Sequence, residues 1–186
     1  KSRVFNSSKN IDGNNLESEI DSHTTIDFTG INLIDVTALR GSNGINNITG
    51  SSAADVINGN NGNDILNGGD GSDTINGGNN NDIINGGLGA DDLYGGAGTD
   101  IFDFDTLDAI DTIFDFDSVN ETLDISDIII GFTGTITDHI NFVDSGANTL
   151  VQVDADGVGG YTTIAQINGI TGLDEATLYG NGQIIV

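Results

Sequence analysis

The sequence predicts an all-β fold, a parallel β-roll with an N-terminal cap and a small C-terminal β-rich domain. Two observations predict the roll: nine residues recur seven times without a gap from Gly41 to Asp103, and the eighth residue of every repeat is large and apolar. A third observation predicts the C-terminal domain, because apolar and acidic residues alternate with period two after Asp103. The expected domains are a cap with lead-in strands over residues 1–40, the roll over 41–103 and the C-terminal domain over 104–186.

The nine-residue repeats share three positions. Position 1 is always glycine, at Gly41, Gly50, Gly59, Gly68, Gly77, Gly86 and Gly95. Position 6 is Asn46 and then an unbroken series of aspartates, namely Asp55, Asp64, Asp73, Asp82, Asp91 and Asp100. Position 8 is always apolar, with Ile48, Ile57, Leu66, Ile75, Ile84, Leu93 and Phe102.

Each repeat is too small to fold by itself. Its first six residues are rich in Gly and Asn, which adopt positive φ and turn tightly. Its last three residues form a short strand with one apolar side chain, which contributes to a core only when the units stack. We therefore predict that two repeats make one coil of eighteen residues, with the position 8 side chains meeting inside.

The stacked aspartates predict a metal site. Stacking places position 6 of every second repeat one above the other at a strand spacing of ~4.8 Å, where two carboxylates would repel. A cation between them removes the repulsion, and a ligand set of carboxylate and carbonyl oxygens favours calcium over magnesium. The chain has no Cys, and no His at the repeat positions, which disfavours zinc.

The expected sites join residues eighteen positions apart: Asn46 with Asp64, Asp55 with Asp73, Asp64 with Asp82, Asp73 with Asp91 and Asp82 with Asp100. We therefore expect about five calcium ions. Ser42 and Ser51 replace the second glycine and adopt left-handed geometry less readily, so the amino-terminal sites are expected to be the weaker ones. Backbone carbonyls of the turns complete the expected ligand set, at Gly59, Gly62, Gly68, Gly69, Gly71, Gly77, Gly78, Gly86, Gly87 and Gly89.

These repeats resemble the glycine- and aspartate-rich nonapeptide G-G-x-G-x-D-x-U-x of the RTX (repeats-in-toxin) family. The resemblance implies a calcium-binding parallel β-roll, which is a calcium-stacked β-solenoid. A disordered acidic linker is the alternative interpretation, but disorder does not keep an apolar residue in register through seven repeats.

The charge of the chain limits its partners. The formal net charge is −25 at pH 7, and every Lys and Arg lies in the first forty residues. This excludes a nucleic-acid backbone as partner and argues against an anionic membrane surface or membrane insertion. We expect a monomeric fragment of a longer protein, because the chain begins at Lys1 and has no signal peptide. Its carboxylates must be neutralised by ions from solution.

The flanking segments contain short strand patterns. Before the repeats, 25–28 and 31–39 are expected to be strands that start and cap the coil, and 16–20 a helical turn. After them, 103–105, 110–117 and 122–128 alternate as half-buried strands do. Residues 148–154 and 161–168 predict a hairpin with a glycine-rich loop, 173–179 a short helix and 182–186 a final strand.

The tail carries a second resemblance. I-F-D-F at 113–116, D-I-S-D-I-I at 124–129, V-Q-V-D-A-D-G at 151–157 and the apolar terminus resemble the C-terminal target region of proteins exported by type I secretion in Gram-negative bacteria. This resemblance implies an export signal, a type I secretion apparatus as partner and a secreted or cell-surface location. It favours a large adhesin as the parent protein, with a secreted RTX protease or lipase as the alternative.

Other functions have weaker signals. No G-x-S-x-G sequence or phosphate-binding motif occurs, so we expect no enzyme active site in this chain. The loop from Asp154 to Gly160 lacks the glycine and glutamate spacing of an EF-hand, and a turn is favoured over an ion site. Position 9 carries Asn58, Asn67, Asn76 and Asn85, which predicts an amide ladder between coils. A calcium-dependent glycan- or surface-binding module remains a third function, because a flat polar ladder could also bind sugars or ice-like water.

Overall fold

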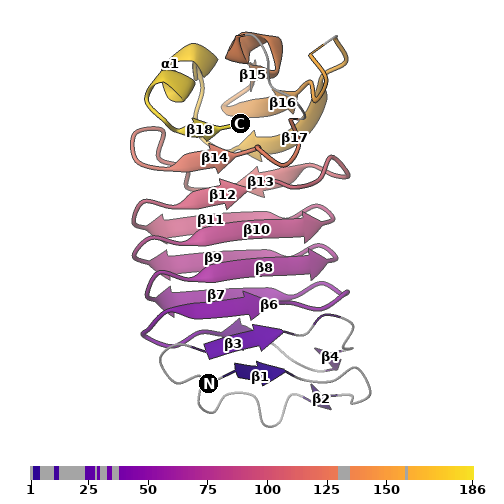
Figure 1. The fold of residues 1–186 in the computed structure, drawn as a ribbon, viewed down its shortest axis with the longest axis vertical. Coiled ribbons are helices and arrows are strands. Elements are labelled where there is room, and N and C mark those ends of the chain that lie inside the picture. Colours follow the sequence, from indigo (N-terminus) through magenta and orange to yellow (C-terminus); the bar gives the residue numbers. More distant parts are fainter. Residues whose placement is uncertain are drawn as a thin grey trace.

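The computed structural model describes residues 2–4, 11–12, 24–27, 29, 33–34, 38–129, 135–157 and 159–186. It is a parallel β-roll, as the repeats predict, with coils stacked along the long axis of the molecule (Figure 1). Two eight-stranded sheets form the two walls of the roll, and each coil contributes one strand to each wall. The fold class predicted from the sequence is therefore confirmed.

Over residues 39–124 the strands alternate between the walls along the chain. The first sheet has the order β1 (Ser2–Val4), β3 (Thr24–Asp27), β6 (Asn46–Thr49), β8 (Ile65–Asp70), β10 (Ile83–Leu88), β12 (Ile101–Asp103), β14 (Thr122–Asp124) and β18 (Ile184–Ile185). The second has the order β15 (Ile140–Ser145), β16 (Asn148–Val153), β17 (Thr162–Ile167), β13 (Asp111–Ile113), β11 (Asp92–Ala97), β9 (Thr74–Asn79), β7 (Val56–Asn61) and β5 (Leu39–Arg40). A separate parallel pair joins β2 (Ile11–Asp12) and β4 (Leu33–Ile34).

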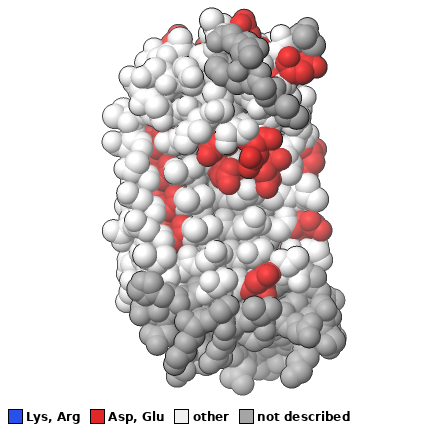
Figure 2. Space-filling view, viewed as in Figure 1, with Lys and Arg blue, Asp and Glu red and all other residues white. Residues whose placement is uncertain are grey.

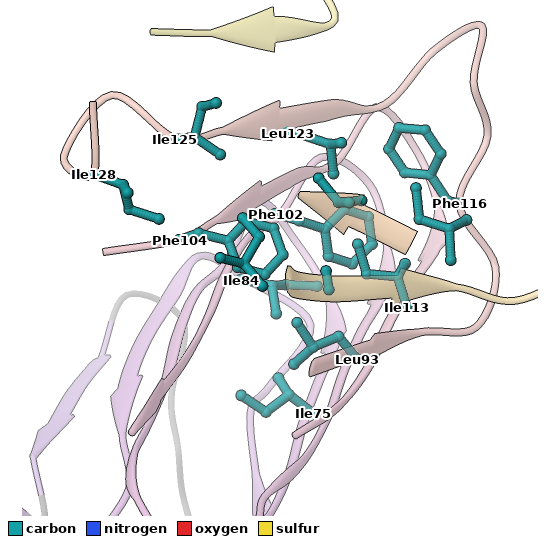
Figure 3. Close-up of a cluster of buried hydrophobic side chains, with 14 of the residues drawn as sticks. Ile75, Ile84, Leu93, Phe102, Phe104, Ile113, Phe116, Leu123, Ile125 and Ile128 are labelled. Atoms are coloured by element: carbon teal, nitrogen blue, oxygen red, sulfur yellow. The ribbon is translucent and has the colours of Figure 1, made fainter. Parts of the chain in front are cut away.

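The position 8 side chains form the core of the roll. Ile48 pairs with Leu66 and Ile57 with Ile75, which is the eighteen-residue register expected from the repeats. All seven side chains at this position are at most 1% exposed. Figure 3 shows the upper part of this core, where side chains from both walls point into the space between the sheets. Stacking therefore gives each single apolar residue a dry environment that no isolated repeat could provide.

The coil continues after the repeat pattern ends. Leu93 pairs with Ile113, and Phe102 pairs with Leu123, so β13 and β14 extend the two walls with longer turns between them. The alternation from 110 to 117 predicted a half-buried strand, and the structure has the strand β13 (Asp111–Ile113) there, with an acidic residue buried at its start. Ile110 is 48% exposed whereas Asp111 is 7% exposed, because Asp111 takes the register of a position 6 aspartate.

The C-terminal residues pack on the last coils (Figure 1). The predicted hairpin is confirmed: β16 and β17 are antiparallel, and β17 then lies parallel to β13. The strand β15 was not predicted; it pairs antiparallel with β16 after the short 3₁₀ helix η1 (Ile136–Asp138). The helix α1 (Glu175–Gly180) begins after Asp174, whose side chain accepts the amide of Thr177. The final strand β18 pairs with β14, so both walls extend into the tail.

The N-terminal strands agree with the predicted lead-in. The strand β3 pairs in parallel with β6, and β5 pairs with β7. The helical turn expected over 16–20 lies outside the described residues. Within the described part of the chain, no helix is long and apolar enough to span a membrane.

The amide ladder lies at a different position from the predicted one. Among the described residues, amide-to-amide hydrogen bonds between coils join Asn43, Asn61 and Asn79 at position 3, with N–O distances of 2.6 and 2.7 Å. The asparagines at position 9 are paired between neighbouring strands, as Asn58 is with Asn76. Among these described side chains, however, no amide-to-amide hydrogen bond is formed. Asn61 and Asn79 are the last residues of β7 and β9 and are paired in the sheet, so side chains at position 3 of successive coils line up outside the core.

Candidate metal sites

The position 6 side chains form two buried columns, one along each edge of the roll. The register places Asp55, Asp73 and Asp91 in one column, and Asn46, Asp64, Asp82 and Asp100 in the other. All of them are at most 8% exposed. The surrounding surface is also acidic: Figure 2 shows a line of Asp and Glu side chains along one side of the molecule, without Lys or Arg among the described residues of that face.

One oxygen of each carboxylate is bonded between coils. The amide of Asp55 donates to Oδ1 of Asp73 at 2.7 Å, and the amide of Asp73 donates to Oδ1 of Asp91 at 2.7 Å. The other column repeats this pattern from Asn46 to Asp100. Because each bond spans one full coil, it holds every aspartate beside the residue expected to share its metal ion.

The second carboxylate oxygen has no partner. Oδ2 is buried without a hydrogen bond at five positions: Asp64, Asp73, Asp82, Asp91 and Asp100. A buried oxygen without a partner costs the full desolvation energy of the group, about 1–3 kcal/mol or more for a charged one. These oxygens therefore require a ligand that the protein chain does not supply.

The free oxygens face a space left open by the position 1 glycines, which we call the glycine notch. At Gly68, a Cβ atom would collide with both Asp73 Oδ2 and the carbonyl oxygen of Gly86 in the next coil. Only glycine permits so close an approach of these two oxygens. The same pairing of a position 6 oxygen with a glycine carbonyl occurs at the notches of Gly41, Gly50, Gly59, Gly68 and Gly77, facing the carbonyls of Gly59, Gly68, Gly77, Gly86 and Gly95.

The donors at the notch fit calcium. The notches of Gly50, Gly59, Gly68 and Gly77 each bring together a carboxylate oxygen and a backbone carbonyl, and calcium accepts six to eight such oxygens in flexible geometry. Within the described residues, no three or more His, Cys, Asp or Glu side chains converge on one point. Carboxylates alone therefore cannot complete the coordination, and turn carbonyls must contribute. Of the glycines expected to supply carbonyls, Gly59, Gly68, Gly77 and Gly86 face a notch.

The first two repeats differ from the others. The amide of Ser51 donates to Asp55 Oδ2 at 2.7 Å, and its hydroxyl donates to the same atom at 2.9 Å. Ser42 makes the same two bonds to Asn46 Oδ1. From the third repeat on, position 2 has positive φ, as in Asn60 at 75°, which is a conformation that serine adopts rarely. The serines thus already partner the oxygens that a metal would bind in the first two turns.

Burial makes the free carboxylates difficult to ionise. Desolvation raises the pKa of Asp64 to about 6, and desolvation together with neighbouring carboxylates raises the pKa values of Asp73 and Asp82 to about 7. The amide bonds from the preceding coil lower these pKa values but do not outweigh burial. At neutral pH the metal-free columns therefore carry a cost that a bound divalent cation would remove.

Without calcium, the folded fraction is expected to fall as the pH rises from about 4 to about 7. An unfolded aspartate titrates near ~3.9, whereas the folded pKa values of Asp64, Asp73 and Asp82 are about 6 to 7, so the folded chain binds more protons in this range. The stability that these protons provide is complete below the unfolded pKa and is lost as the pH passes the folded pKa. Circular dichroism of the chain in the presence of a calcium chelator, at a series of pH values, measures the folded fraction. A folded fraction that increases with pH would contradict this prediction.

The substitution Gly68→Ala is expected to remove one ion. Its methyl group would occupy the notch between Asp73 Oδ2 and the Gly86 carbonyl. The matched control is Gly180→Ala, where an added Cβ meets nothing within 4 Å. Equilibrium dialysis at saturating calcium counts the ions per chain. An unchanged count in Gly68→Ala would show that the notch is not the site.

Sequence reasoning missed two buried acids that continue the columns. Asp111 follows Asp91, and Glu121 follows Asp100, in the strand register. A local signal was present: Asp111-Thr112-Ile113 repeats the tripeptide of residues 73–75, and 121–123 resembles it, with Glu in place of Asp and Leu in place of Ile. The longer turns before these tripeptides hid the pattern from a search for a strict period of nine.

The Asp154 loop is a satisfied turn. Asp154 is 3% exposed, and its two carboxylate oxygens accept the amides of Gly157 at 3.1 Å and Gly159 at 2.6 Å. Desolvation acts to raise its pKa, but the amide donors outweigh it and the pKa lies below the ordinary value. The carboxylate thus has its own partners, in contrast to the aspartates of the columns.

Comparison with known proteins agrees with the repeat geometry. Residues 40–75 and 67–102 match the family model of the RTX calcium-binding nonapeptide repeat, which comprises four copies. Among solved structures, the solution structure of the AlgE6R3 subunit from the Azotobacter vinelandii mannuronan C5-epimerase is similar, with 23% identity, a TM-score of 0.35 and coverage of 80% of this chain and 79% of that chain. No curated protein matches the sequence. The family match covers the residues that form the two columns.

Proposed function

Because residues 40–102 are RTX calcium-binding nonapeptide repeats, we propose that this chain is a calcium-dependent folding module and C-terminal export signal of a large extracellular protein. The observation that carries the proposal is the buried, unpartnered Oδ2 atom repeated along both columns. At Asp64, Asp73 and Asp82 this atom faces a notch where a calcium ion would have carboxylate and carbonyl ligands. The proposed ligands are those expected from the sequence, from Asn46 through Asp100, with weaker sites at Asn46 and Asp55.

The mechanism is linkage between calcium binding and folding. Extracellular modules bind calcium with Kd values of about 10⁻⁴ to 10⁻³ M. In a cytosol with far less free calcium the sites stay empty, and the chain remains unfolded and able to thread an export channel. Outside the cell, where calcium is about millimolar, each site is at about one to ten times its Kd and stabilises the fold by about 0.4 to 1.4 kcal/mol. The external ion thus decides where folding takes place.

We assign the export signal to residues 104–186, with 1–40 as the cap and 41–103 as the calcium-binding roll. The tail sequences 113–116, 124–129 and 151–157 support this, through their resemblance to type I secretion targets. Pairing of β13 and β14 with the roll supports folding of the two parts together. In this proposal the tail leaves the cell first, and calcium-driven folding of the adjoining roll hinders its return.

The proposed parent protein is a surface adhesin of a Gram-negative bacterium. A secreted protease or lipase with the same export route is the alternative parent, and a calcium-dependent glycan-binding module is the alternative activity. Four described aromatic side chains favour the folding role over glycan binding. Phe102 and Phe116 are buried, and the rings of Tyr94 and Phe114 stack on each other with their centroids 4.7 Å apart. That stack covers one face of each ring, which a sugar would otherwise use.

Export is expected to require the tail and to depend on external calcium. A reporter fused to residues 1–186 and expressed with a type I exporter should accumulate in a medium containing millimolar calcium, and much less in a medium with a calcium chelator. Deletion of 104–186 should abolish export in both media. As a control, magnesium should not replace calcium. An export rate that is independent of external calcium would contradict the folding mechanism, and export without 104–186 would contradict the assigned signal.

A further inference from the structure

Asp111 and Glu121 extend the two columns by one coil beyond the last nonapeptide. Asp111 lies at the start of β13 and is 7% exposed, and Glu121 directly precedes β14 and is 2% exposed. The register places them beside Asp91 and Asp100, the last aspartates of their columns. Neither belongs to the nonapeptide motif, which ends at Asp103.

Glu121 takes the place of a glycine carbonyl at the last notch. A Cβ on Gly95 would lie 2.7 Å from Asp100 Oδ2 and 2.9 Å from Glu121 Oε1. The other Glu121 oxygen, Oε2, accepts the amide of Asp117 at 2.8 Å, which orients Oε1 toward the notch. Asp100 is 0% exposed, and its Oδ2 is buried without a hydrogen-bond partner. Two carboxylate oxygens therefore face one space, where the repeats have one carboxylate and one carbonyl.

Asp111 reproduces the arrangement of the repeats in the other column. Its Oδ1 accepts the amide of Asp91 at 3.0 Å, as each position 6 aspartate accepts the amide of the preceding coil. Asp91 is 1% exposed, and its Oδ2 is buried without a partner at the notch of Gly86. Asp91 thus has one bonded and one unbonded oxygen, as Asp73 has, while the three atoms nearest to a Cβ on Gly86 all belong to Asp91.

No cationic side chain can neutralise these acids, because the sequence has no Lys or Arg after Arg40. Ionised pairs at these positions need a cation from solution to be stable in a buried environment.

We infer that Asp111 and Glu121 are additional calcium ligands, so that Asp91 with Asp111 and Asp100 with Glu121 bind two ions beyond those of the nonapeptide pairs. This inference rests on the proposed calcium binding by the repeats. Both ions would join the roll to the first coil of the C-terminal tail, since Asp111 and Glu121 lie at β13 and β14. The tail would then become ordered by the same ion that folds the roll.

The test counts bound calcium in the 186-residue chain by native mass spectrometry, which reads the ion number of the folded species. Glu121→Gln and Asp111→Asn are each expected to bind one ion fewer than the wild type, and the double variant two fewer. Asp105→Asn and Asp127→Asn, which change exposed acids near the same strands, should bind as many ions as the wild type. Circular dichroism at saturating calcium verifies that each variant folds.

Asp100→Asn provides a second measurement that does not depend on folding of the first variants. It should lose two ions if Glu121 is a ligand, since Asp100 then belongs to two sites, and one ion if its column ends at Asp100. An unchanged count in Glu121→Gln and Asp111→Asn, or the loss of a single ion in Asp100→Asn, would overturn the inference. A wild-type chain that binds no calcium would instead overturn the proposed function.

Discussion

Removal of calcium at neutral pH is expected to unfold the roll, and return of calcium to refold it. The columns bury carboxylates whose pKa values are raised to about 6 to 7 at Asp64, Asp73 and Asp82. Near pH 7 each of these groups is either ionised without a counter-ion or protonated at a pH where a free aspartate would be ionised. Both states cost free energy. Calcium removes that cost at every notch, so loss of the ion destabilises all coils together.

Circular dichroism during a calcium titration of the chelated chain measures this effect. We expect a transition from coil to β-structure with a midpoint near ~10⁻³ M, the range of extracellular calcium modules. Magnesium at the same concentration should not produce it, because magnesium prefers a small octahedral site and retains its waters. Sodium chloride at matched ionic strength controls for charge screening. A compact roll at neutral pH in a strong chelator would contradict the calcium dependence.

Asp73→Ala is expected to shift the calcium midpoint more than Asp55→Ala. Asp73 belongs to two pairs: its Oδ1 accepts the amide of Asp55, and its own amide donates to Asp91. Its Oδ2 is without a partner, whereas Asp55 Oδ2 already accepts two bonds from Ser51. We expect about a tenfold higher midpoint for Asp73→Ala, which corresponds to about 1.4 kcal/mol, and a smaller shift for Asp55→Ala.

The matched control for this comparison is Asp70→Ala, which removes an exposed carboxylate from the same repeat. It should leave the midpoint close to that of the wild type, because an exposed carboxylate contributes little to a buried site. Equal shifts in Asp70→Ala and Asp73→Ala would mean that net charge, rather than the buried columns, controls folding. A larger shift in Asp55→Ala than in Asp73→Ala would contradict the proposed sharing of ligands.

The repeated part of the fold could be predicted because one residue type has one role there. An apolar residue at position 8 of every nine-residue repeat can be buried only inside a stack, as Leu66 and Ile75 are. An aspartate at position 6 of every repeat then must lie above the aspartate eighteen residues away, as Asp64 and Asp82 do. In this region local spacing determines the three-dimensional neighbours.

Prediction failed for residues whose neighbours in the stack do not follow from the nine-residue spacing. The sequence did not place Asp111 inside, because an alternating pattern does not tell which set of residues faces inward, and a shift of one residue exchanges the two faces. Glu121 was not recognised because the turn before it is longer than a repeat turn. The position 9 asparagines were expected to bond to one another, but the observed ladder joins Asn43, Asn61 and Asn79.

The sequence by itself determined the coil, its core and the order of the carboxylates, since the nine-residue period dictates which residues stack. Only the tertiary structure decided which oxygens have partners, because hydrogen bonding depends on backbone conformation. Ser42 and Ser51 donate hydrogen bonds to the position 6 oxygens of the first two repeats, whereas the Oδ2 atoms of the later repeats have no partner. It also decided where the columns end, because backbone pairing of β13 and β14 continues the register through turns of a different length.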